Sequence, residues 1–180
     1  MRENKLTIKT IALIAVMTAV TCVLAPLSLP IGPVPISLTN LAIYFGLYIL
    51  GVKKESLSYI VYMLIGLAGL PVFSNFTGGV GKLFGPTGGY IIGFLPMAVI
   101  AGIFIDRSKG KLLPSLLGMV LGTVICYALG TAWLAYQANM DFKAALFAGV
   151  IPFIPGDLIK MALAAVFGPK ISGQLRKAGI

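Results

Sequence analysis

Two ionisable residues stand in an otherwise apolar stretch of the sequence, IPFIPGDLIKMALAAVF. Asp157 and Lys160 are spaced i, i+3, so on a helix they share one face and can form an ion pair. An ionisable side chain inside a membrane costs at least about 2.5 to 3.5 kcal/mol, and such residues are functional candidates by default. The pair fits a polar, nearly neutral head group such as a ureido ring. The alternative is a buried salt bridge that fixes one helix against its neighbours.

Three helix-breaking residues precede this pair. Pro152, Pro155 and Gly156 predict a break after which a helix restarts. Asp157 would then lie near a helix N-terminus, where free N–H groups and the helix dipole stabilise a carboxylate.

A second candidate element is the glycine-rich segment GPTGGYIIGF. Gly88 and Gly89 permit close approach of the backbone to a ligand, and Tyr90 offers a flat face and a hydroxyl. The same glycines are also compatible with membrane helices that pack through small residues. The segment is not a nucleotide-binding fingerprint, because no strand is predicted before it.

Composition places these residues in a membrane protein. Of the 180 residues, 58% are hydrophobic and 11% are charged, against roughly 25% charged in an average soluble domain. Apolar stretches recur at the roughly 17 to 25 residues that a membrane-spanning helix needs. We therefore expect an all-α integral membrane protein in which residues 1–180 form a single domain.

Six transmembrane helices are expected from the apolar stretches. They run over Thr7 to about Leu29, Leu38 to Gly51, Ser56 to Leu70, about Thr87 to Ile105, Leu112 to about Tyr136, and Ala144 to about Phe167. The first resembles a signal peptide, but its apolar run is long and further helices follow, so we interpret it as a retained helix. The connection from Pro71 to Pro86 is far longer than a helical hairpin needs, which is typical of a functional loop.

The basic residues predict the orientation. One side of the membrane collects Arg2, Lys5, Lys9, Lys53, Lys54, Arg107, Lys109, Lys111, Lys170, Arg176 and Lys177, and the other has Lys82 and Lys143. Because Lys and Arg favour cytoplasmic loops, we expect both termini in the cytoplasm of a multi-pass protein of the cell membrane. The net charge of +9 is thereby explained by orientation, and no nucleic-acid partner is expected.

Several kinds of chemistry are excluded or disfavoured. The chain has no histidine, which rules out a histidine-based triad or zinc site. Cys22 and Cys126 fall inside expected helices without CxxC spacing, so we interpret them as free thiols. Only one of five acidic residues lies in an expected helix, which disfavours an intramembrane transferase. We expect no enzyme, metal or cofactor, and a small channel or structural subunit remains an alternative.

The sequence resembles the BioY family, the biotin-specific S components of energy-coupling-factor (ECF) vitamin transporters. The resemblance rests on GPTGGY, the preceding TGGVG, PGDLIK, the prolines of PIGPVPIS and six apolar stretches. It implies a six-helix S-component bundle with an outward biotin pocket, docked on a transmembrane coupling subunit with two ATPase subunits. An S component for a different vitamin is the nearest alternative.

The resemblance also implies roles for single residues. Asp157 and Lys160 match the polar ligands of the biotin head group, and Tyr90 with Gly88 and Gly89 matches the pocket wall.

Two positions depart from the family pattern. Thr39 and Asn40 stand near the start of the second helix, where the family often has Gln before a polar residue. Ile91 follows the tyrosine of GPTGGY, where some relatives have a basic residue. We therefore take Lys82 and Asn75 as substitute anchors for the carboxylate of biotin.

The first helix carries small residues at helical spacing, Ala12, Ala15 and Ala19. Small residues at i, i+4 let membrane helices approach closely, and in S components such alanines resemble the docking face for the coupling subunit. Gly118 and Gly122 show the same spacing in the fifth helix.

Overall fold

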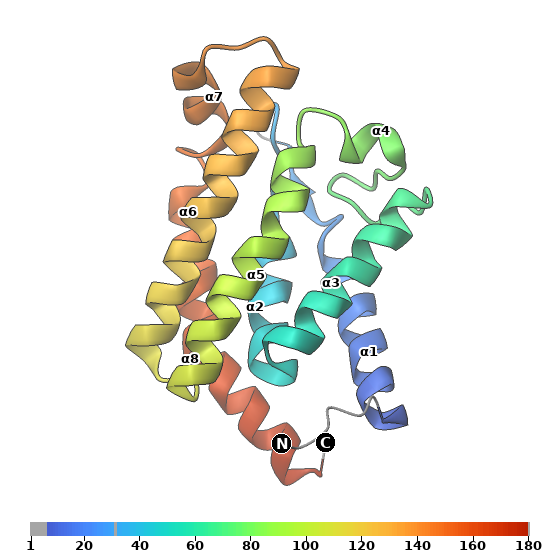
Figure 1. The fold of residues 1–180 in the computed structure, drawn as a ribbon, viewed down its shortest axis with the longest axis vertical. Coiled ribbons are helices and arrows are strands. Elements are labelled where there is room, and N and C mark those ends of the chain that lie inside the picture. The colour runs from blue at the N-terminus through green and yellow to red at the C-terminus, as the bar shows by residue number, and fades with distance from the viewer. Residues whose placement is uncertain (1–6, 31, 180) are drawn as a thin grey trace.

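The computed structural model describes residues 7–30 and 32–179. Within these ranges the chain forms eight helices and one two-stranded antiparallel hairpin. In chain order the elements are α1 (Ile8–Leu24), β1 (Ser28–Leu29), β2 (Ile36–Ser37), α2 (Thr39–Leu50), α3 (Val52–Leu67), α4 (Val80–Leu83), α5 (Gly88–Ser108), α6 (Leu112–Gln137), α7 (Phe142–Gly149) and α8 (Ile154–Lys177). The long helices form one bundle, with the short α4 at one end of it (Figure 1).

The helices differ in how well they match the thickness of a membrane. Among the described residues, α5 and α6 are each long and apolar enough to cross, and α7 with α8, bent by 48° at their break, together form a third candidate span. The apolar helices α1 and α2 have 17 and 12 residues, which is short for a full crossing. The predicted helical membrane architecture is confirmed, while six spans stay a prediction.

Several predicted boundaries are wrong. The sixth stretch is not one helix, because the chain breaks between Gly149 and Ile154, and α8 then continues to Lys177 through the basic tail. The first helix ends at Leu24, since Ser28 and Leu29 pair with β2 instead. The predicted restart before Asp157 is confirmed, because that residue lies in the first turn of α8.

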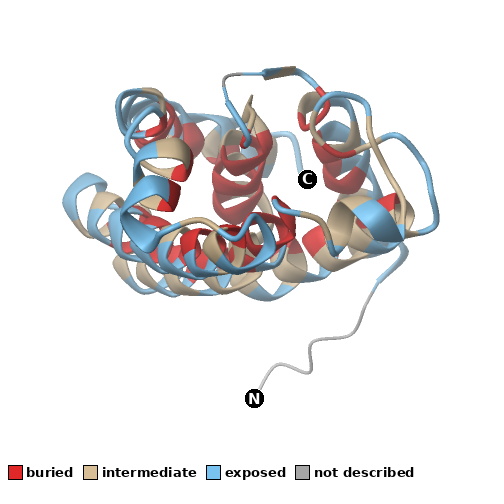
Figure 2. Cartoon of the chain, turned by 90° about the horizontal axis from the view of Figure 1, so that it is seen from above, coloured by how far each residue is buried: buried red, intermediate tan, exposed pale blue. Residues whose placement is uncertain are grey.

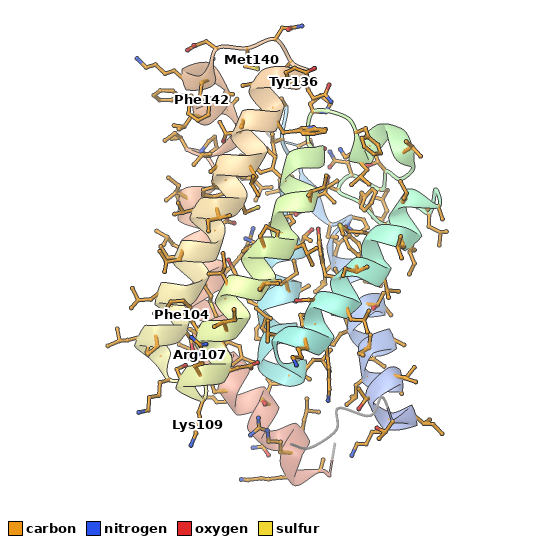
Figure 3. All side chains as sticks on the ribbon, in the orientation of Figure 1. Phe104, Arg107, Lys109, Tyr136, Met140 and Phe142 are labelled. Carbon is orange, nitrogen blue, oxygen red and sulfur yellow. The ribbon has the colours of Figure 1, made fainter. Side chains whose placement is uncertain are left out.

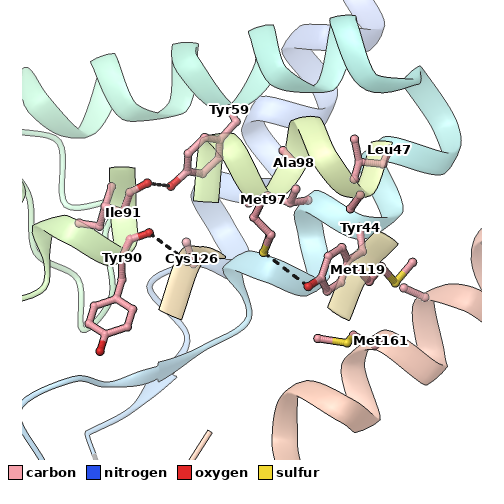
Figure 4. Packing of buried hydrophobic residues seen from close by; sticks show 14 of the residues in the cluster. Tyr44, Leu47, Tyr59, Tyr90, Ile91, Met97, Ala98, Met119, Cys126 and Met161 are labelled. Atoms are coloured by element: carbon pink, nitrogen blue, oxygen red, sulfur yellow. Dashed lines mark hydrogen bonds between the residues drawn. The ribbon is translucent and has the colours of Figure 1, made fainter. Parts of the chain in front are cut away.

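The interior of the bundle is rich in tyrosine and other polar side chains. Buried residues lie on the inward sides of the helices (Figure 2), and each buried hydroxyl needs a partner in a low-dielectric interior. Tyr59 Oη donates to the carbonyl of Ile91 at 2.7 Å, and Tyr44 Oη reaches Met97 Sδ at 3.4 Å (Figure 4). These bonds join α2 and α3 to α5.

The two ends of the bundle differ in character. Arg107 and Lys109 lie at the end where α8 finishes, and Tyr136, Met140 and Phe142 lie at the opposite end (Figure 3). This separation is compatible with the orientation predicted from Lys and Arg. We refer to the end with Tyr136 and α4 as the aromatic end.

Candidate ligand-binding site

A cavity opens among α2, α3, α5, α6 and the start of α8. Its volume is about 60 Å³, enough for several water molecules and hence for the head of a small molecule. Polar side chains in its wall are Ser37, Thr39, Asn40, Ser74, Thr87, Thr123, Asp157 and Lys160, and aromatic ones are Tyr59, Tyr62, Phe73, Tyr90, Phe94, Tyr127 and Phe153. An aromatic wall with convergent polar groups is typical of a small-molecule site.

Asp157 and Lys160 form the polar centre of this cavity. Lys160 Nζ donates to Asp157 Oδ1 at 3.0 Å and to the carbonyl of Ser37 at 2.7 Å. Asn40 Nδ2 donates to the same Asp157 oxygen at 2.9 Å, and Tyr127 Oη donates to Asp157 Oδ2 at 2.5 Å. Asp157 is 7% exposed and Lys160 is 8% exposed, so this is a buried ion pair with its own hydrogen-bond partners.

The hydrogen bonds within the protein leave some donor and acceptor positions of the pair unoccupied. A carboxylate has about four acceptor positions, and protein donors fill three of those on Asp157. An ammonium has three N–H donors, and acceptors take two of those on Lys160. The pair therefore keeps one acceptor position, on Oδ2, and one donor, which together complement an N–H beside a carbonyl.

Local structure explains why these groups meet. Pro155 stands in the first turn of α8, where its missing N–H costs nothing, and Asp157 follows where the helix dipole favours a carboxylate. The hairpin of β1 with β2 holds Ser37 just before α2, so its carbonyl faces Lys160. Asn40, in the first turn of α2, accepts from the N–H of Leu41, which fixes the side-chain amide that serves Asp157.

Tyr90 lines the cavity, and glycines on two other helices make room for it. A Cβ atom added to Gly130 of α6 would lie 2.3 Å from the Tyr90 ring, and one added to Gly149 of α7 would lie 2.0 Å from Tyr90 Oη. The ring is therefore clamped between α6 and α7.

Gly88 and Gly89 lie elsewhere. In the described part of the chain they do not line the cavity. A Cβ on Gly88 would lie 1.7 Å from the carbonyl oxygen of Leu83, and one on Gly89 would lie 2.3 Å from Trp133 Cβ. In this structure the two glycines let α5 pack closely against α4 and α6, which was the alternative interpretation of their pattern.

Asn75 and Lys82 lie outside the described cavity wall, on the long connection between α3 and α5. Asn75 Oδ1 accepts from Ser28 Oγ at 2.7 Å, which ties this connection to β1. Lys82 belongs to α4, and partial burial lowers its pKa. Phe73 and Ser74 from the same connection do line the cavity, so Asn75 adjoins a wall residue in the chain.

The three alanines of α1 are exposed on one side of that helix. Ala12, Ala15 and Ala19 are accessible, whereas Met17 and Thr18 face the bundle. The stripe is therefore open to a partner helix.

Several wall residues were missed from the sequence. Tyr127 was not singled out, although a buried carboxylate requires donors and a tyrosine within an apolar helix is a source of one. Tyr59 and Tyr62 stand three residues apart on α3, and that i, i+3 spacing places both on one face. Phe94 on α5 carried no comparable signal.

Comparison with known proteins gives concordant matches. A family model described as the BioY family matches residues 1–177. A probable biotin transporter BioY of Pyrococcus horikoshii is 38% identical over 166 residues, covering 92% of this chain and 98% of the relative. A biotin transporter BioY of Thermotoga maritima is 38% identical over 156 residues, covering 87% and 91%. A crystal structure described as the S-component for biotin from an ECF-type ABC transporter matches with a TM-score of 0.85 and 32% identity, covering 95% of this chain and 94% of that one.

Proposed function

The chain belongs to the BioY family, and on that premise we propose how its cavity serves biotin uptake. The protein is the biotin-binding membrane subunit, or S component, of an ECF-type transporter, and it is not an enzyme. The observation that supports a role for the cavity is the buried Asp157–Lys160 pair, which lines it with one acceptor and one donor unused.

The ureido ring of biotin has the complementary groups. One ureido N–H donates to the open position on Asp157 Oδ2, and the ureido carbonyl accepts the third N–H of Lys160. Asn40 orients the carboxylate from the opposite side, and the hydroxyl of Thr39 adds a polar group to the wall. Asp157 and Lys160 are both ionised, so each of their hydrogen bonds to the ureido ring is about twice as strong as one between neutral groups.

The apolar part of biotin meets aromatic rings. Tyr90, Tyr59 and Tyr62 belong to the cavity wall, and a thioether sulfur makes favourable contacts with aromatic rings of about 0.3 to 1.5 kcal/mol. Gly88 and Gly89 contribute indirectly, because they set how closely the segment before Tyr90 packs on its neighbours.

The carboxylate of biotin extends toward the connection between α3 and α5. Lys82 and Asn75 are our proposed anchors, because they belong to the connection that supplies Phe73 and Ser74 to the cavity wall. Desolvation by burial lowers the pKa of Lys82, and an anionic partner would offset that cost of burying the charged amine.

The transport cycle requires partners and an orientation. We propose six membrane-spanning segments in the cell membrane with both termini cytoplasmic, so that the aromatic end faces outward. The exposed stripe of Ala12, Ala15 and Ala19 docks on a transmembrane coupling subunit, and two ATPase subunits drive release of biotin inward. Small residues suit such docking because they allow close helix contact without a deep pocket.

The test is ligand identification on the detergent-purified protein. Native mass spectrometry should detect bound biotin after expression in biotin-containing medium, and calorimetry should show tight binding. Asp157→Asn should weaken binding at least about 10-fold through the loss of a charged acceptor. Asp141→Asn is the matched control, because Asp141 caps α7 at an exposed position and Asn caps equally well. Another bound vitamin, with no biotin binding, would assign the chain a different substrate.

A further inference from the structure

Tyr127 makes the shortest hydrogen bond at the polar centre of the cavity. Its Oη donates to Asp157 Oδ2 at 2.5 Å, the range of strong O–H···O⁻ bonds. The residue is half-buried on α6, and its neighbour Thr123, one turn earlier, is engaged by Tyr44 Oη at 2.6 Å. Neither hydroxyl competes for the other's partner, so the Tyr127 hydroxyl is directed to Asp157.

The distribution of donors over the carboxylate gives Tyr127 a distinct role. Asn40 and Lys160 both donate to Oδ1, so among the described residues Tyr127 is the one side chain that donates to Oδ2. Two donors on Oδ1 hold that oxygen in place but make no contact with Oδ2. A donor on the second oxygen fixes the carboxylate plane and occupies one of the two acceptor positions there.

Tyr127 also separates two spaces. Thr123, Tyr127 and Asp157 line the cavity and, from the other side, an apolar groove of about 450 Å³ between α6 and the bent pair of α7 and α8. Exposed apolar side chains such as Val124 and Leu158 form the rest of that groove. Tyr127 and Asp157 therefore belong to the shared wall between the cavity and a mostly apolar groove.

We propose that Tyr127 is a positioning residue of the biotin site, acting through Asp157. Its hydroxyl holds the carboxylate in the plane in which the remaining acceptor position on Oδ2 faces the ligand. Its ring forms part of the wall between the site and the groove. This inference rests on the proposed function, because the group that Asp157 receives is the ureido N–H of biotin.

The experiment is a double-mutant cycle on the full chain with biotin binding as the readout. Tyr127→Phe keeps the ring and removes the hydroxyl, and should raise the Kd for biotin about 10-fold. In an Asp157→Asn background the same change should alter the Kd by no more than about twofold, because residues that act as one unit are not additive. Tyr136→Phe is the matched control, since Tyr136 lies on the same helix and is 79% exposed.

The outcomes separate this proposal from the proposed function. Equal effects of Tyr127→Phe in both backgrounds, or no effect in either, would overturn the positioning role while leaving biotin binding intact. A wild-type protein that does not bind biotin would overturn both. Infrared spectroscopy gives a second readout that does not depend on ligand: Tyr127→Phe should shift the carboxylate stretch that Asp157→Asn removes, and an unchanged band would count against the hydrogen bond.

Discussion

A buried ion pair can stabilise the fold, and it can bind a ligand. Removing Lys160 alone, and then together with the charge of Asp157, distinguishes these two roles. Lys160→Met deletes the ammonium and fills its volume with an apolar chain. Asp157 then remains buried with two donors, from Asn40 and Tyr127, in place of three. Breaking a buried pair on one side costs about 3 to 5 kcal/mol of stability, and the two remaining donors place the expected loss at the lower end, about 3 kcal/mol.

Biotin affinity should fall for a different reason. The variant lacks the N–H that we assign to the ureido carbonyl, a hydrogen bond to a charged group worth about 2 kcal/mol, or about 30-fold in Kd. In the double variant Asp157→Asn with Lys160→Met no buried charge remains, so most of the lost stability should return. The affinity should not return, because both ligand contacts are then changed.

Thermal unfolding in detergent and calorimetric titration with biotin measure the two quantities on the same samples. If the double variant regained both stability and affinity, the pair would serve only to hold α8 against α2, as the salt-bridge interpretation of the sequence requires. If Lys160→Met left stability unchanged, the contacts drawn for its ammonium would be wrong.

Three further predictions concern the wall, the partner and the carboxylate. Gly130→Ala places a Cβ 2.3 Å from the Tyr90 ring and should lower the free energy of unfolding by about 1 to 3 kcal/mol, measured in thermal melts. Gly156→Ala is the control and should leave stability unchanged, because the space around Gly156 is open. Ala15→Trp should leave biotin binding by the purified subunit intact and abolish uptake by cells; loss of binding would instead make α1 a folding element. Lys82→Gln should weaken the binding of biotin more than the binding of biotin amide, which lacks the carboxylate. In the wild type the preference for biotin over biotin amide should fade as pH rises through the depressed pKa of Lys82, since only the protonated amine attracts a carboxylate. If that preference depended neither on pH nor on Lys82, another residue would be the anchor.

The parts of this site that the sequence predicts are those set by local chemistry. The prolines before Asp157 predict the restart of α8, and the i, i+3 spacing predicts the pair with Lys160, because both depend on neighbours in the chain. The cost of a charge in a membrane marks the two residues as functional candidates wherever the other helices lie.

The parts that escape the sequence depend on how distant elements pack. Tyr127 and Asp157 are 30 residues apart in the sequence, and Ser37 and Lys160 are 123 apart, so no local sequence pattern predicts either contact. Glycine was the least predictable residue type. Gly88 and Gly89 were expected in the pocket wall, but among the described residues they lie outside it and admit α4 and α6, whereas Gly130, which makes room for Tyr90, carried no signal.

The charge balance of the cavity suits the polar, neutral ring that we propose as its ligand. Asp157 and Lys160 cancel each other's charge, and their desolvation is met during folding by Ser37, Asn40 and Tyr127. In the proposed binding mode the ureido ring would add two hydrogen bonds to groups that are already dehydrated and oriented, which is the condition under which such bonds contribute most to affinity. Because a buried pair is screened little by salt, binding of the head group should be nearly independent of ionic strength, and any salt dependence must come from the carboxylate end.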